Sequence, residues 1–85
     1  LRADLEVHKR INLKKENLPK ELLGRKVIEI KDYDGLKLIC ADESWLMFRV
    51  SGTEPIVRVY AEAKSLNRSK RLLTWGSGLV LKHAL

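Results

Sequence analysis

The stretch FRVSGTEPIVRVYAEA, residues 48–63, decides the fold, because two strand-like runs in it are separated by a polar loop. After the loop, apolar residues of one parity (Val57, Val59, Ala61 and Ala63) alternate with Arg58, Tyr60 and Glu62. Alternation with a period of two is typical of a strand with one buried and one exposed face. The stretch therefore predicts a strand over residues 56–63, preceded by the apolar run 45–50 as a second strand.

Turn signals outside this stretch divide the rest of the chain into short elements. Further strands are predicted over residues 7–14, 25–31 and 36–41, with Asp34-Gly35 as a tight turn before the last of them. Pro19 and Gly24 suit the first turn and the C-terminal cap of a short helical turn over residues 17–24.

A longer helix is predicted from Leu66 to about Leu85, with Ser65 as its N-cap and apolar residues at helical spacing. Strands joined by short turns, with helical segments before and after them, predict an α+β fold. We expect a small, mainly antiparallel sheet of four to five strands packed with helices.

Composition places the chain among ordinary folded domains. Its 85 residues, 45% hydrophobic and 33% charged, predict a single domain over residues 1–85 with a modest core. The single cysteine, Cys40, excludes an intramolecular disulfide and is expected in the core. No apolar run approaches the ~20 residues of a membrane span, so we expect a cytoplasmic protein without a membrane partner.

The net charge of +6 raises the alternative of a stand-alone nucleic-acid-binding module. Such a module would use the basic residues of the C-terminal segment (Lys64, Arg68, Lys70 and Arg71). The middle of the chain, residues 32–63, has three Lys/Arg against six Asp/Glu. Charges scattered in this way favour solvated faces over a nucleic-acid surface, so no nucleic-acid partner is predicted.

Polar groups other than those of the loop are read as structural. Asp32 and Asp34 offer two carboxylates, but an Asp-Gly pair between two strands favours a turn over a magnesium site. His8 and His83 stand far apart without acidic or cysteine partners, which argues against catalysis by either.

The loop itself combines groups suited to an anion. Gly52 can adopt a left-handed conformation that lets backbone N–H groups converge, and Ser51 and Thr53 add hydroxyl donors. Arg49 and Arg58 flank the loop with guanidinium groups that bind two phosphate oxygens well. These residue types alone leave two readings open, an anion-binding loop and a plain strand-to-strand connection.

The segment SWLMFRVSGTEPIVRVYAEAKS closely resembles the C-terminal domain of the α-D-phosphohexomutases, the phosphoglucomutase/phosphomannomutase family. The family signature is an Arg-Pro-Ser-Gly-Thr-Glu-Pro loop followed by an Arg-Val-Tyr strand and a Glu. The resemblance covers roughly residues 25–75, and Val50 departs from it where the family usually has Pro.

The resemblance implies a part of a four-domain isomerase that moves a phosphoryl group between C1 and C6 of a hexose. In that family a phosphoserine and a Mg²⁺ site lie in other domains, so no catalytic and no metal-binding residue is expected in this chain. The resemblance also implies a fold similar to that of the TATA-box-binding protein. By the same resemblance, this chain is the fourth domain of the enzyme. It would hold the non-reacting phosphate of a hexose phosphate through Arg49, Ser51, Gly52, Thr53 and Arg58.

Two further expectations follow from the resemblance. The partners would be the hexose phosphate and the N-terminal domains of the same protein, and the isolated chain would be inactive. A phosphoglucosamine mutase is the alternative within the family, and the sugar is not identified because the sugar-reading loop belongs to another domain.

Overall fold

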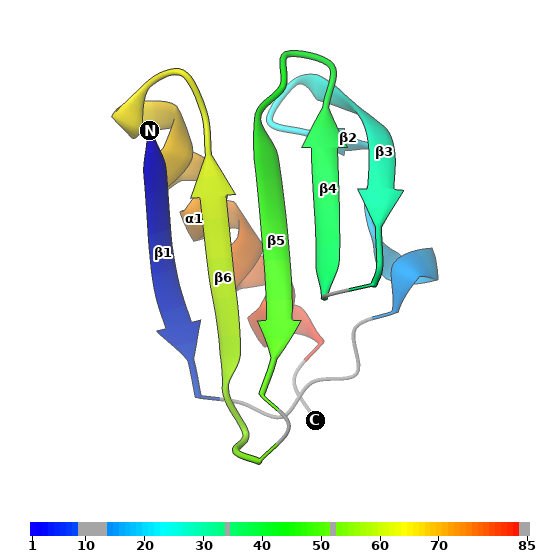
Figure 1. Ribbon diagram of the computed structural model, residues 1–85, viewed down its shortest axis with the longest axis vertical. Helices are drawn as coiled ribbons and strands as arrows, with labels where there is room; N and C mark the ends of the chain where they lie inside the picture. The colour runs from blue at the N-terminus through cyan, green and yellow to red at the C-terminus, as the bar shows by residue number, and fades with distance from the viewer. Residues whose placement is uncertain (9–13, 34, 52, 84–85) are drawn as a thin grey trace.

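The computed structural model describes residues 1–8, 14–33, 35–51 and 53–83 of the chain (Figure 1). Its elements are β1 (Arg2–Val7), the 3₁₀ turn η1 (Lys15–Asn17), β2 (Glu21–Leu22), β3 (Arg25–Lys31), β4 (Leu36–Cys40), β5 (Trp45–Val50), β6 (Val57–Glu62) and α1 (Leu66–Lys82). The predicted α+β class is therefore confirmed.

The strands form one antiparallel sheet in the order β1-β6-β5-β4-β3-β2. Figure 1 shows α1 crossing behind the sheet, so one face of β1, β6 and β5 is covered and the other is open. The sheet has six strands where four to five were predicted, and one α-helix covers it. The likeness to the TATA-box-binding-protein fold stays a prediction.

The predicted helical turn over residues 17–24 is wrong, and this error accounts for the extra strand. Glu21 and Leu22 pair with Lys26 and Arg25 as a short hairpin. Leu23 (φ 47°) and Gly24 (φ 83°) form its two-residue turn, and two consecutive positive φ values match a tight hairpin turn. The glycine that suggested a helix cap therefore closes a hairpin instead.

The other predicted elements agree with the structure to different degrees. Residues 25–31 and 45–50 form β3 and β5 as predicted, whereas the first strand ends at Val7 and so precedes most of the predicted range 7–14. Residues 9–13 of that range lie outside the described residues. The helix starts as predicted, with Arg68 N donating to Ser65 Oγ at 3.1 Å, and it ends at Lys82.

The core lies between the sheet and α1. The side chains of Val57, Val59 and Ala61 are fully buried on the covered face of β6, which confirms the predicted alternation. On α1, Gly76 lies so close to the sheet that a β-carbon there would be 3.0 Å from Leu46 Cδ1. Gly76 thus allows the helix to approach β5 closely.

One irregularity marks the far side of the sheet. The β3–β4 register shifts between Val27 and Glu29, so Ile28 is an extra residue in β3. This is a β-bulge, and the Ile28 side chain is 61% exposed.

Candidate functional site

The two arginines that flank the loop lie side by side on adjacent strands. Arg49 of β5 and Arg58 of β6 are directly paired, next to the last pair Val50–Val57. The polar loop begins immediately beyond this pair, at the lower end of the sheet in Figure 1. Like charges directly opposite each other in a sheet repel, and an anion bound between them would relieve that repulsion.

The loop between them is closed by its own backbone. Ser51 N donates to Ile56 O at 3.0 Å, and Ile56 N donates to Glu54 O at 2.8 Å. The amides of Thr53 and Glu54 both donate to Ser51 Oγ at 3.3 Å. Two backbone donors therefore converge on one point beside the hydroxyl of Ser51. Gly52, the fifth predicted site residue, lies outside the described residues.

The surroundings of the arginines include two residues that the sequence did not indicate. Arg58 Nη1 lies 2.6 Å from Glu6 Oε1 of β1, and the Arg58 side chain is 51% exposed. The Arg49 guanidinium carbon lies 5.8 Å from the centroid of the Tyr60 ring. Glu6 lies next to Arg58 because β1 pairs with β6. The first strand was predicted over residues 7–14, a range that does not include Glu6.

The turn before β4 supports this end of the sheet from one side. Gly35 has a φ of 97°, and a β-carbon on it would overlap the carbonyl oxygen of Phe48 and lie 3.3 Å from Arg49 Cα. Only glycine fits this close approach without a shift of the backbone. Gly35 therefore lets the chain before β4 lie against the backbone of β5 next to Arg49, whereas Asp34 lies outside the described residues.

Three other groups considered from the sequence, Asp32, His8 and Cys40, lie beside ion-pair partners or in the core. Asp32 Oδ2 lies 3.8 Å from Lys15 Nζ, and no cluster of three or more His, Cys, Asp or Glu that could hold a metal occurs among the described residues. His8 is exposed, with Nε2 3.6 Å from Glu6 Oε2. Cys40 is fully buried, and burial raises the pKa of its thiol, which agrees with the predicted core role.

Three of the four basic residues of the nucleic-acid alternative are exposed, whereas Arg68 is partly buried. Arg68 turns inward, where Nη2 donates to Leu22 O at 3.2 Å and Nη1 donates to Leu23 O at 3.3 Å. Its Nε lies 3.6 Å from Asp42 Oδ2, and a hydrogen bond from Ser44 lowers the pKa of this carboxyl. Arg68 thus ties the helix to the β2–β3 hairpin, which weakens the nucleic-acid alternative.

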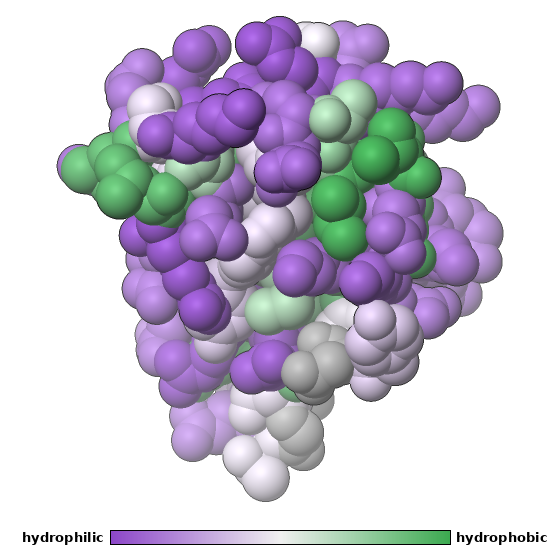
Figure 2. All heavy atoms as spheres, turned by 45° about the horizontal axis from the view of Figure 1, so that its top comes forward, coloured by the Kyte–Doolittle hydropathy of each residue, from purple (hydrophilic) through white to green (hydrophobic). Residues whose placement is uncertain are grey.

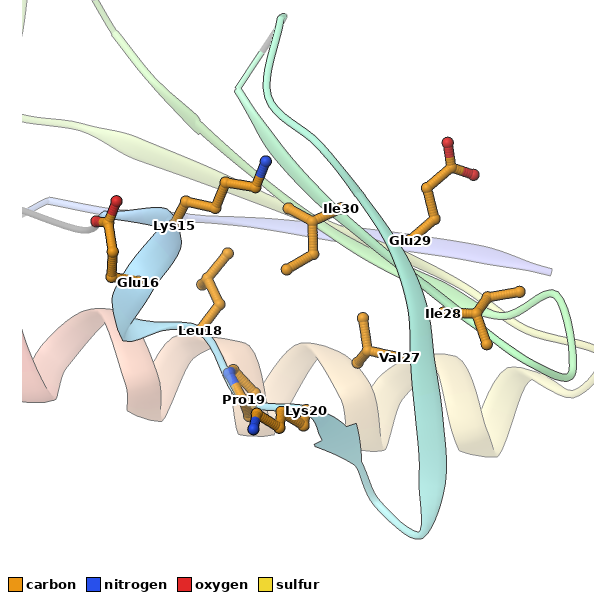
Figure 3. A pocket seen from close by; sticks show the side chains of 9 residues that line it. All are labelled: Lys15, Glu16, Leu18, Pro19, Lys20, Val27, Ile28, Glu29 and Ile30. Carbon is orange, nitrogen blue, oxygen red and sulfur yellow. The ribbon is translucent and has the colours of Figure 1, made fainter.

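Two of the hollows outside the loop differ in their lining. One, of about 490 Å³, has an apolar floor of Leu18, Val27 and Ile30 below a rim of charged residues of both signs (Figure 3). The other, of about 320 Å³, opens on the uncovered face of the sheet next to Arg49.

Hydrophilic side chains cover most of the end of the sheet opposite the loop (Figure 2). Within the described part of the chain, no helix is long and apolar enough to cross a membrane.

Comparisons with known proteins extend over most of the chain. The family model described as "Phosphoglucomutase/phosphomannomutase, C-terminal domain" matches residues 4–74. A phosphoglucomutase/phosphomannomutase of Thermococcus kodakarensis is 42% identical over 60 residues, which cover 71% of this chain and 13% of that protein.

Relatives with other names match as well. A probable phosphoglucosamine mutase of the same organism is 36% identical, covering 73% of this chain and 15% of its own length. A phosphoglucosamine/phosphogalactosamine mutase of Sulfurisphaera tokodaii is 35% identical, covering 69% of this chain and 14% of that protein. The chain thus spans only about a seventh of the length of these relatives. It belongs to the phosphoglucomutase/phosphomannomutase family and corresponds to the C-terminal domain of that family.

Proposed function

We propose that this chain is the phosphate-holding domain of a hexose-phosphate mutase. Its loop binds the non-reacting phosphate of a hexose phosphate while a phosphoryl group moves between C1 and C6. Arg49, Ser51, Gly52, Thr53 and Arg58 form the site. The observation that carries the proposal is the direct pairing of Arg49 with Arg58 at the mouth of the loop.

The chemistry of the loop supports a phosphate rather than a neutral ligand. Two guanidinium groups can each donate two hydrogen bonds to phosphate oxygens. The Thr53 and Glu54 amides, which share Ser51 Oγ as acceptor, can donate to a phosphate oxygen if the Ser51 side chain rotates away. These donors recognise the phosphate and not the carbon that bears it, so either end of a hexose bisphosphate can occupy the site.

Glu6 has a defined part in this proposal. Its carboxylate holds Arg58 at 2.6 Å in the absence of ligand, and it must share or release that guanidinium when phosphate binds. The ion pair keeps the arginine in place beside the loop at a cost in phosphate affinity.

The chemical steps belong to other parts of the protein. A remote phosphate clamp contributes by orienting the substrate, because phosphoryl transfer depends mainly on positioning and on stabilisation of charge. We assign the phosphoserine and the Mg²⁺ that the resemblance implies to the other domains of the same protein, so the chain alone is inactive. The relatives are named as mutases of glucose, mannose or amino-sugar phosphates, and these names do not favour one of the sugars as the substrate here.

Titration of the ¹⁵N-labelled chain with glucose 1-phosphate, followed by NMR, tests the proposal. We expect saturable shifts of the Ser51, Thr53 and Glu54 amides. Removal of one charged donor costs about 1.5–3 kcal/mol, so Arg49→Gln is expected to weaken binding by at least about tenfold.

Arg71→Gln is the matched control, because Arg71 is exposed on α1 and remote from the loop. Equal losses in both variants, or shifts confined to residues 64–83, would contradict the proposal. Salt-sensitive binding of a DNA duplex that Arg49→Gln leaves unchanged would favour the nucleic-acid alternative instead.

A further inference from the structure

The hollow on the uncovered face of the sheet has an unusual lining. Among the described residues, its walls carry four cationic side chains, its floor is formed by Trp45 and Met47, and no carboxylate lines it (the described lining is Arg2, Lys31, Tyr33, Gly35, Lys37, Trp45, Met47 and Arg49). Its volume of about 320 Å³ is at the lower end of the range of small-molecule sites, roughly 300–1,000 Å³. The lining thus combines positive charge with an apolar floor.

Two of these cations are placed against each other by the sheet. Lys31 of β3 and Lys37 of β4 are direct cross-strand partners, and both are only partly exposed. Like charges in such a pair repel, and partial burial weakens the screening by water. Along the part of the chain that the structure describes, no carboxylate lies within ion-pair distance of either lysine.

Two of these cations, Lys37 and Arg2, lie over aromatic rings. Lys37 Nζ lies 4.3 Å from the centroid of the Trp45 ring, and the Arg2 guanidinium carbon lies 5.1 Å from the centroid of the Tyr60 ring. An aromatic face attracts a cation without neutralising it. The charges of Lys37 and Arg2 therefore remain available to a ligand.

We propose that this hollow is a second anion-binding site, for the phosphate group of a small organic phosphate or for inorganic phosphate. Lys31 and Lys37 are its principal ligands, and Met47 and Trp45 contact the apolar part of the ligand. The site differs from the loop in its residues, because it uses lysines of β3 and β4 while the loop uses Ser51, Thr53 and Arg58. Arg49 borders both.

The two tryptophans provide a direct readout. Trp45 lies in the floor of the hollow, with Nε1 donating to Glu62 Oε2 at 2.8 Å, whereas Trp75 lies on the helix-covered side. We would titrate the labelled chain with inorganic phosphate at constant ionic strength, set with chloride, and follow both indole N–H signals by NMR. The Trp75→Phe variant assigns the two signals.

We expect a saturable shift of the Trp45 indole signal and none of the Trp75 signal. Lys31→Gln/Lys37→Gln removes two charged donors and is expected to lower the affinity by at least about tenfold. Lys20→Gln/Lys26→Gln, which removes two exposed lysines outside the hollow, keeps the affinity within about twofold.

The loop and the hollow can be tested separately. Arg58→Gln is expected to abolish the shifts of the Ser51 and Thr53 amides and to leave the Trp45 shift intact. A Trp45 shift that chloride alone reproduces, or that survives the loss of Lys31 and Lys37, would overturn the second site. A repeat with glucose 1-phosphate shows whether an attached sugar strengthens binding, as contact with Met47 and Trp45 predicts.

Discussion

The two faces of β5 and β6 differ in what their residues contribute. Toward α1, these strands present Leu46, Phe48, Val57 and Val59, all buried. Toward solvent they present cationic and aromatic side chains, including two arginines that oppose each other. The covered face gains stability from apolar burial, whereas the open face carries charged groups that pair with one another at the surface. The period of two in one sequence stretch thus separates the residues of the core from those of the proposed site.

The largest expected change in stability comes from comparing two neighbouring residues of β5 whose side chains point to opposite faces. Phe48→Ala is expected to lower the free energy of unfolding by about 3–5 kcal/mol, because Phe48 is 2% exposed and a cavity would remain. Arg49→Gln is expected to change it by less than about 0.5 kcal/mol. Urea unfolding followed by circular dichroism measures both. Similar losses in the two variants would show that the faces are not separable.

A smaller effect is expected for the two glycines of α1. Gly78→Ala should raise the free energy of unfolding by about 0.5–1 kcal/mol, because no atom lies within 4 Å of the added β-carbon. Gly76→Ala introduces a contact of 3.0 Å with Leu46 on the covered face. We expect Gly76→Ala to be less stable than Gly78→Ala by at least about 1 kcal/mol in thermal and urea unfolding. Equal values would contradict the close approach of helix and sheet.

The smallest effect concerns the open face. Lys37→Gln removes one member of the Lys31–Lys37 pair and is expected to raise the free energy of unfolding by about 0.2–1 kcal/mol. The gain should shrink as salt is added, because ions screen the repulsion. Unfolding at low and high chloride concentration measures it. A loss of stability at both concentrations would mean that the lysine contributes more through its packing on Trp45 than it costs through its charge.

Much of the fold could be predicted because the local signals agree with the burial. The alternation of β6, the Ser65 cap and the positive φ of Gly35 each follow from chemistry within a few residues. The β2–β3 hairpin was missed because a glycine with positive φ can end a helix or close a turn, and only the partner strand distinguishes them. The first strand was misplaced because its pairing with β6 spans more than fifty residues.

The site was predictable to a similar extent. Its residue types were evident in the loop, but the direct pairing of Arg49 with Arg58 depends on the register of the hairpin. The contact of Arg58 with Glu6 and the hollow beside Arg49 depend on long-range order of the strands. A single sequence contains no local pattern that brings Lys31 next to Lys37.

The bulge at Ile28 has a consequence for how these molecules behave toward each other in concentrated solution. β3 lies near the side of the sheet, and the short β2 pairs only with Arg25 and Lys26. A regular, flat edge at this place would offer a template on which a strand of a second molecule could be added. The extra residue interrupts the repeat of outward-pointing backbone groups, and Glu29 next to it adds charge. The exposed isoleucine thus lies in a bulge that makes this part of β3 a poorer template for strand addition.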